Sequence, residues 1–305
     1  MTAGMRRCAR ERIRKAESNP VSAAVRRGSV LQKVAKRRPS FFHKPRRVFF
    51  PEGWTALIKK SFRGLLPLLW VLLPLAATAQ STTLSEAWVQ AIQQRDADRL
   101  MTLLGAGSVD VNLVNDQGKT ALMIGAQSGD RPLCAALIKA GAKINVTNAN
   151  GGTPLMHAAV GGNVQIVTAM LDAGARPNVR AVNGWTALAL ASAKGHITVM
   201  ERLLLSGADP NTGDVFGWTP LMHAVEQERT DAVVLLLSQA QTQVNQRNTD
   251  GVTALHRALA QGSSEISRLL VGAGASMDLE DESGRTPADY ARETGNANIL
   301  EDLSS

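Results

Sequence analysis

Residues 81–305 alternate between two kinds of apolar segment in a regular order. The first segment follows a Gly-x-Thr triplet, with an apolar side chain two residues after the threonine and a small residue five after it. The second, such as "ITVMERLLL" from residue 197, follows a turn and carries paired large apolar residues. Both patterns place apolar side chains on one face of a short helix. Six triplets recur at spacings of 33, 33, 33, 34 and 33, at 118–120, 151–153, 184–186, 217–219, 251–253 and 284–286.

The residue types around each triplet predict where each first helix begins and ends. The threonine supplies a hydroxyl to the free amides of a helix start, and in three units a proline follows at the first helical position, where its missing N–H is harmless. In five units a glycine nine residues after the threonine favours a left-handed helix end. The predicted capping residues are Thr120, Thr153, Thr186, Thr219, Thr253, Thr286, Pro154, Pro220, Pro287, Gly129, Gly162, Gly195, Gly262 and Gly295.

The segments "GGTPLMHAAVGGN" and "LLLSGADPN" are the most specific parts of the repeat. In these motifs the chain resembles the ankyrin-repeat family over residues 84–305. The resemblance implies an all-α solenoid, in which each unit is a helix–turn–helix with a β-hairpin finger. A single unit cannot bury enough apolar surface to fold alone, so stability comes from stacking.

About seven units are expected, of which the outermost two act as caps. Residues 80–114 lack the triplet and form the N-terminal cap, residues 115–280 hold five repeats, and residues 281–305 form the C-terminal cap. One repeat departs from the pattern, because Glu228 stands where glycine is expected and one residue is added before the next finger. We expect a strained loop at Glu228 and a bulge at the insertion.

The charge is divided unevenly along the 305 residues. Residues 1–79 carry 18 Lys and Arg against 3 Asp and Glu, while residues 80–305 carry 16 against 23. The whole chain is therefore +8, but residues 80–305 are net −7. An acidic surface repels phosphates, which argues against nucleic-acid binding by the repeats.

Residues 57–79 have the parts of a secretory signal peptide. Lys59, Lys60 and Arg63 precede the apolar run "LLPLLWVLLPLAATA", which ends in small residues before Gln80. This predicts export to the periplasm of a bacterium, with cleavage after Ala79. The alternatives are secretion, a buried helix or an uncleaved anchor, although the run is short for a membrane span.

Residues 1–56 form an unusually long basic leader. They are either a disordered extension or an untranslated stretch upstream of a later start, such as Val48 or Leu57. The later start is favoured, because a start near Leu57 leaves a signal peptide of ordinary length.

The sequence offers no arrangement of residues for catalysis or for holding a metal or cofactor. Cys134 lies in an apolar helical segment and is expected to be a buried filler. His157 and His223 share a repeat position two units apart, too far for one metal ion, and they are expected to make local hydrogen bonds. No phosphate-binding loop or nucleophile elbow is present. The protein is therefore not expected to be an enzyme.

The few aromatic residues point to a binding surface. Of the five in residues 80–305, three lie on the fingers of neighbouring repeats. The resemblance implies that partners contact the concave face at positions four, three and one before the threonine, and seven and eight after it. Exposed aromatic and apolar side chains there indicate a protein-binding site. The predicted contacts are Val182, Trp185, Lys194, Val215, Phe216, Trp218, Glu226, Gln227, Asp250 and Val252.

These observations favour an exported, monomeric adaptor that binds a protein partner. The resemblance implies that the partner could be a periplasmic enzyme, because such proteins sometimes accompany secreted or stress-defence enzymes. A second hypothesis is a nucleic-acid or anionic-membrane binder that uses the basic tail, and a third is a secreted effector. Another interpretation of Trp185 and Trp218 is structural: the rings pack on neighbouring fingers and stiffen them.

Overall fold

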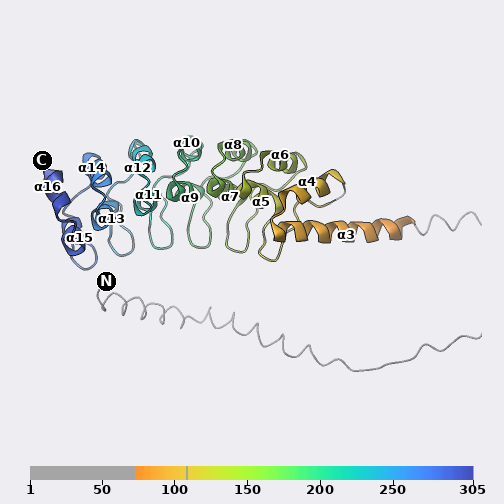
Figure 1. Cartoon of the computed structure of the whole chain (residues 1–305), viewed down its shortest axis with the longest axis horizontal. Helices are drawn as coiled ribbons and strands as arrows, with labels where there is room; N and C mark the ends of the chain where they lie inside the picture. The colour runs from red at the N-terminus through yellow and green to blue at the C-terminus, as the bar shows by residue number, and fades with distance from the viewer. Residues whose placement is uncertain (1–72, 108, 305) are drawn as a thin grey trace, which may run out of the picture. The chain divides into compact units, whose positions relative to one another are not determined.

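The computed structural model describes residues 73–107 and 109–304. Residues 1–56 and most of the predicted signal peptide lie outside the described residues. Within the described part there are 14 helices, arranged as seven consecutive pairs (Figure 1). The pairs are α3 (Leu73–Gln94) and α4 (Ala97–Gly105), α5 (Ala121–Ser128) and α6 (Arg131–Lys139), α7 (Pro154–Gly161) and α8 (Val164–Asp172), α9 (Ala187–Lys194) and α10 (Ile197–Leu205), α11 (Pro220–Glu226) and α12 (Thr230–Leu237), α13 (Ala254–Gln261) and α14 (Ser264–Gly272), and α15 (Pro287–Thr294) and α16 (Asn298–Ser304).

From α5 onward the helices form two rows. The first helices of the pairs contact one another in sequence from α5 to α15, and the second helices do the same from α4 to α16. The loops that precede the first helices project together on one side, as Figure 1 shows. We call these loops the fingers. The predicted helical solenoid is therefore confirmed.

The core lies between the rows and between successive pairs. The leucines two residues after each capping threonine are buried, as the pattern predicted. Cys134 is also buried, and its burial raises the pKa of the thiol to about 12. The buried leucines are Leu122, Leu155, Leu188, Leu221 and Leu255.

The predicted caps form at the first helix of each repeat. All six threonine hydroxyls accept a hydrogen bond from the amide three residues later, at 3.2–3.5 Å. Five of these helices end at a glycine in the left-handed region. Local sequence therefore fixes both ends of these helices.

Each finger is a tight turn rather than a pair of extended strands. In the described residues, isolated β-bridge pairing is limited to Val114 with Thr120. The base of a finger closes through a backbone bond such as Ala181 N to Trp185 O (2.9 Å), and successive fingers are joined by single backbone bonds such as Val215 N to Asn183 O (3.1 Å). Hydrogen bonds between fingers therefore fix the spacing of their tips.

A row of asparagines joins the loops at the other end of the repeats. The Asn178 amide donates to Gly207 O (2.8 Å) and accepts from Asp209 N (2.9 Å), both in the next repeat. Asn145 and Asn245 make the same pair of bonds. These side chains replace a regular sheet as the link between loops.

The divergent repeat has the strained backbone expected at Glu228, and hydrogen bonds hold the loop that contains the inserted residue. Glu228 is held at φ +53°, in the left-handed region that favours glycine. After α12, the Thr242 hydroxyl donates to Leu236 O (2.6 Å), and Asn211 still bonds Gln241 O and Gln243 N. The extra residue is thus absorbed before the asparagine row resumes.

Candidate functional site: the finger face

Most finger tips are held by an acidic or amide side chain at their base, whereas the finger of Val182 has Ala181 at this position. Asp214 is buried, and its Oδ1 accepts from the amides of Phe216 (2.8 Å) and Trp218 (3.0 Å). This side chain satisfies the turn amides and leaves the residue between Asp214 and Phe216, Val215, at the tip. The same arrangement recurs at Asn148, which accepts from Asn150 and Gly152.

Three apolar side chains on two neighbouring fingers are exposed. Val182 is 75% exposed, Val215 51% and Phe216 64%. Val182 and Val215 occupy the same position of successive fingers, which the bond between Val215 N and Asn183 O holds together. We call these three residues the finger patch. An ordered, exposed apolar group of this kind is typical of a protein-binding surface.

Trp185 and Trp218, unlike Phe216, are not fully exposed to solvent. Both are half-buried, and the Trp185 ring lies on the His223 ring of the next repeat with centroids 4.0 Å apart. Trp218 lies 5.7 Å from His223, and the guanidinium carbon of Arg257 lies 5.5 Å from its ring centroid. Both tryptophans therefore pack within the array, but on first-helix residues rather than on the neighbouring fingers that the second interpretation named.

His223 lies at the centre of this stack. Its Nε2 is 3.3 Å from Oδ2 of Asp214, and both side chains are buried. Burial lowers the pKa of His223, although the neighbouring Asp214 carboxylate acts in the opposite direction. The ring therefore serves as an apolar surface for the tryptophans as well as a partner for the finger base.

The polar residues expected around the patch lie near it, and one of them, Glu226, is hydrogen-bonded to the next repeat. Glu226 Oε2 accepts from Arg257 Nε (2.8 Å) and from Gln261 Nε2 (3.1 Å). Gln227, Lys194 and Asp250 are exposed. These residues surround the finger patch with polar groups, and their contact with a partner stays a prediction.

Val252 is the exception, and its predicted exposure is wrong. It is only 9% exposed, and its amide donates to Asn248 Oδ1 (2.8 Å). Its position matches that of Trp218 in the preceding repeat, but the smaller side chain lies within the finger base. The exposed strip therefore ends at the finger of Phe216.

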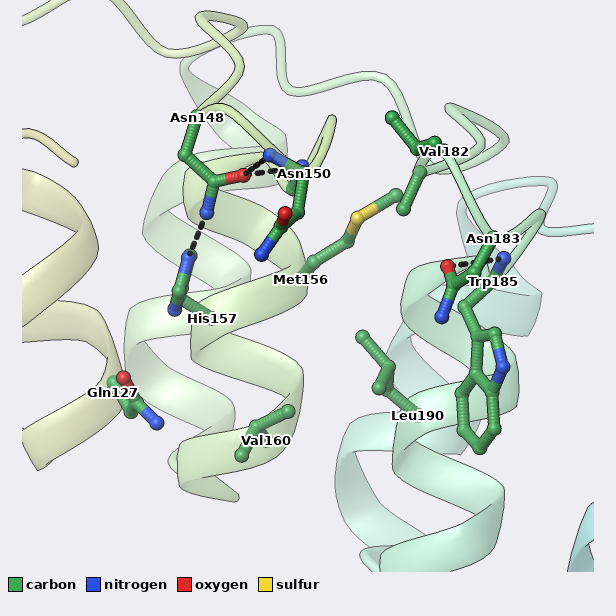
Figure 2. A pocket seen from close by; sticks show the side chains of 12 residues that line it. Gln127, Asn148, Asn150, Met156, His157, Val160, Val182, Asn183, Trp185 and Leu190 are labelled. Carbon is green, nitrogen blue, oxygen red and sulfur yellow. Dashed lines mark hydrogen bonds between the residues drawn. The ribbon is translucent and has the colours of Figure 1, made fainter. Parts of the chain in front are cut away.

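A pocket of about 470 Å³ lies beside the patch, between α7 and α9 (Figure 2). Val182 and Trp185 line it from one finger, and Leu190 lines it from α9. On the other side, His157 Nε2 lies 3.1 Å from the Asn148 amide nitrogen. Burial first, and then the charges of Lys119 and Arg95, lower the pKa of His157 to about 4, so this ring is neutral at pH 7.

Sequence reasoning named residues at the ends of the first helices, Lys194, Glu226 and Gln227, but missed those near their starts. Four residues after the capping threonine, His223 and Arg257 lie against the tryptophan of the preceding finger, and His157 and Leu190 line the pocket. The signal was available in the recurrence of histidine at this position. What it contacts depends on the neighbouring repeat, however, and only the fold shows that.

No group of three or more His, Cys, Asp or Glu residues suited to a metal ion occurs in the part of the chain that the structure describes. Within the same residues, none of the helices combines the length and apolar character needed to cross a membrane.

Comparison with known families and proteins agrees with this architecture. The family described as ankyrin repeats (3 copies) matches residues 88–181, 173–248 and 231–305, which together span most of the chain. The protein therefore belongs to the ankyrin-repeat family. Ankyrin repeats are protein–protein interaction modules, and the fold is generally a non-enzymatic scaffold.

Among curated proteins, the matches are short. Potassium channel AKT3 of Oryza sativa subsp. japonica is 46% identical over 50 residues, which cover 16% of this chain and 6% of the channel. Protein fem-1 homolog A of Bos taurus is 48% identical over 61 residues, 20% of this chain and 9% of that protein. The chain thus matches less than a tenth of either relative's length.

Solved structures match over more of the chain. The human ASB11 ankyrin repeat domain has a TM-score of 0.63 at 28% identity, covering 72% of this chain and 97% of that domain. The ankyrin repeat domain of Bcl-3 has a TM-score of 0.59 at 27% identity, covering 70% and 97%. A chain from the complex of a Bdellovibrio bacteriovorus predatory endopeptidase with an immunity protein has a TM-score of 0.55 at 30% identity, covering 60% and 98%.

Proposed function

We propose that this protein is an exported adaptor that binds another protein through the finger face. The observation that carries the proposal is the finger patch, in which Phe216, Val182 and Val215 are exposed on fingers held in place by backbone hydrogen bonds. A rigid group of exposed apolar side chains with a polar rim can be covered by a partner at low entropic cost.

The proposed compartment is the periplasm, reached through the signal peptide at residues 57–79. The predicted cleavage site after Ala79 lies within α3, and cleavage there would leave Gln80–Gln94. Among residues 83–94, the part of α3 whose side chains the structure describes, Trp88, Ala91 and Ile92 are buried, and all three remain after cleavage. Removal of the signal therefore keeps these buried side chains.

The partner class that we favour is an exported enzyme. One structural neighbour comes from a complex between an endopeptidase and an immunity protein, so a chain of related fold occurs in a complex that contains an enzyme. The concave inner surface next to the fingers would then cover part of that enzyme, and the adaptor itself would act as a monomer without chemistry of its own.

Phe216→Ala tests the proposal. The full chain and the variant are expressed in the native organism with a tag and cross-linked, and the recovered partner is then purified for calorimetry. Loss of the phenyl ring is expected to weaken partner binding by about 2 kcal/mol, because exposed aromatic anchors supply much of the energy of an interface.

Leu205→Ala provides the matched control. Leu205 is 82% exposed at the end of α10, in the other helix row, so its removal deletes a similar apolar surface away from the fingers. The control variant is expected to bind like the wild type. Equal affinities for Phe216→Ala and the wild type would rule out the finger patch as the binding site.

N-terminal sequencing of the natural protein tests the compartment and the competing hypothesis together. A start at Gln80 is expected, which removes the basic tail and with it nucleic-acid or membrane binding by that segment. A natural protein that retains residues 1–56 would contradict cleavage and favour the tail hypothesis.

A further inference from the structure

One finger position recurs directly before each capping threonine, and in two repeats it holds a tryptophan that reaches the next repeat. Trp185 lies on His223, and Trp218 lies beside Arg257. In both cases the contacted residue is four positions after the threonine of the following repeat. The residues at the recurring finger position are Lys119, Gly152, Trp185, Trp218, Val252 and Arg285.

Gly152 is the member of this series without a side chain. The residue that a side chain at 152 would reach in the next repeat is Leu190, and both residues line the 470 Å³ pocket. The pocket thus lies where the next two repeats place an indole ring. Its volume falls in the range of pockets that bind small ligands or single large side chains.

The walls of the pocket suit a ring with an apolar body and a polar edge. Met156 and Leu190 provide apolar surface, and Figure 2 shows them facing the space between α7 and α9. The amide groups of Asn150 and Gln127 and the ring of His157 line the same pocket. Tyrosine and tryptophan combine these two characters.

The charges on one side of the pocket favour an acidic partner. Lys119 and Arg95 act electrostatically on His157, which lines the pocket, and no charged side chain lines the pocket itself. Lys119 and Arg95 also line a second hollow together with one carboxylate, that of Asp116, which accepts from Gln93. Two cations against one anion leave a net positive edge.

We propose that the pocket beside Gly152 receives an aromatic side chain from an acidic segment of the protein partner. The partner ring takes the place that Trp185 and Trp218 fill in the following repeats, and a partner carboxylate next to the ring lies toward Lys119 and Arg95. This inference rests on the proposed function and adds the chemistry of the segment that is recognised.

The test uses N-acetyltryptophan, which carries an indole and a carboxylate, as the probe. Binding to the ¹⁵N-labelled full chain is followed by amide chemical shifts, which should move in residues 148–161 and 182–190. Neutral N-acetyltryptophanamide should bind more weakly, and cationic tryptophanamide weakest. Absence of shifts with N-acetyltryptophan, or equal binding of all three compounds, would overturn the inference.

Gly152→Trp should fill the pocket from within. A Cβ at Gly152 comes within 3.1 Å of the Asn148 side chain, which must therefore shift slightly. A similar turn carries an indole at Trp218, which Asp214 holds through the same two bonds that Asn148 makes to Asn150 and Gly152. Affinity for N-acetyltryptophan should fall at least tenfold. Gly152→Val introduces the residue that the equivalent position 252 carries, and it should lower the affinity by a smaller factor. This variant keeps the test valid if Gly152→Trp folds poorly.

Gly105→Trp is the matched control, because a side chain at this end of α4 meets no atom within 4 Å. It should bind the probe like the wild type. Lys119→Gln should lower the affinity for N-acetyltryptophan to that for its neutral amide. The affinity for the neutral amide should not change. Unaltered probe binding by Gly152→Trp would overturn the pocket assignment.

The outcome separates this inference from the proposed function. Phe216→Ala should leave probe binding unchanged, because Phe216 does not line the pocket. If the probe fails to bind while Phe216→Ala still weakens the protein partner, the pocket inference is wrong and the adaptor function stands. If the probe binds and Phe216→Ala has no effect on the partner, the finger patch is wrong and the pocket remains.

Discussion

At the scale of single residues, two side chains in the repeats are expected to lower the stability of the fold. One has an unfavourable backbone conformation, and the other is a buried titratable group. Glu228 takes a left-handed conformation that five other repeats assign to glycine. His157 is a titratable ring that burial and two nearby cations keep neutral. Both effects are local, so each can be measured by one substitution.

Glu228→Gly should stabilise the protein by about 0.5–1 kcal/mol. It relieves a left-handed strain of about 1–2 kcal/mol, part of which is offset by the greater freedom of glycine in the unfolded chain. Urea unfolding measures the change. Gly129→Glu is the reverse control, because a Cβ there meets only one atom, at 4.0 Å, and so isolates the strain. A loss of stability in Glu228→Gly would contradict this account.

His157 should make stability fall as the pH is lowered. The folded-state pKa of about 4 lies below the unfolded value near 6.5, so the unfolded chain takes up the proton first. The stabilisation is present above pH 6.5 and is lost between pH 6.5 and 4. Wild-type protein should lose about 1–2 kcal/mol more than His157→Gln between pH 7 and pH 5 in urea unfolding. Parallel losses in the two proteins would exclude His157 as the source.

At the scale of the element, a finger is a turn whose geometry comes from its own sequence but whose surroundings come from the next repeat. The Asx side chain at the base fixes the tip, as Asp214 does for Phe216 and Trp218. The positions of the fingers were therefore predictable from the triplet. The half-burial of Trp185 was not, because the ring that covers it, His223, lies 38 residues further along the chain.

Removal of the two finger aromatics should therefore have different effects. Trp218→Ala should lower stability by about 1–3 kcal/mol, since the ring packs on His223 and Arg257 and partly against the core. Phe216→Ala should change it by less than about 0.5 kcal/mol, because its side chain is exposed. Thermal unfolding of both variants separates these roles. Similar melting temperatures would show that Trp218 has no structural role.

At the scale of the whole molecule, stability is the sum of contacts between neighbouring pairs. Contacts between helices link each pair chiefly to the next, so a terminal pair has one neighbour and a central pair has two. The buried residues of α3, among them Trp88, close one end, and Ile299 on α16 closes the other.

Ile299→Ala should loosen the last helix pair without unfolding the rest. Loss of this buried side chain costs about 2–4 kcal/mol. The last helix pair is held by contacts with only one neighbouring pair, so this loss is large enough to open it. Hydrogen exchange should therefore speed up in residues 287–304 and stay unchanged in residues 121–205. Leu188→Ala, a buried change in the centre, should instead lower protection on both sides. Uniform loss of protection in Ile299→Ala would show that the array unfolds as one unit.

Sequence alone determined the repeat, its helix ends, its capping threonines and the strained Glu228, because these depend on residues within a few positions of one another. It also predicted which finger residues form a binding surface. The tertiary structure decided which of them are exposed: it buried Val252, placed Trp185 on His223 and left Phe216 in solvent. It also revealed the pocket at Gly152, because a missing side chain becomes a cavity only when the next repeat is packed against it.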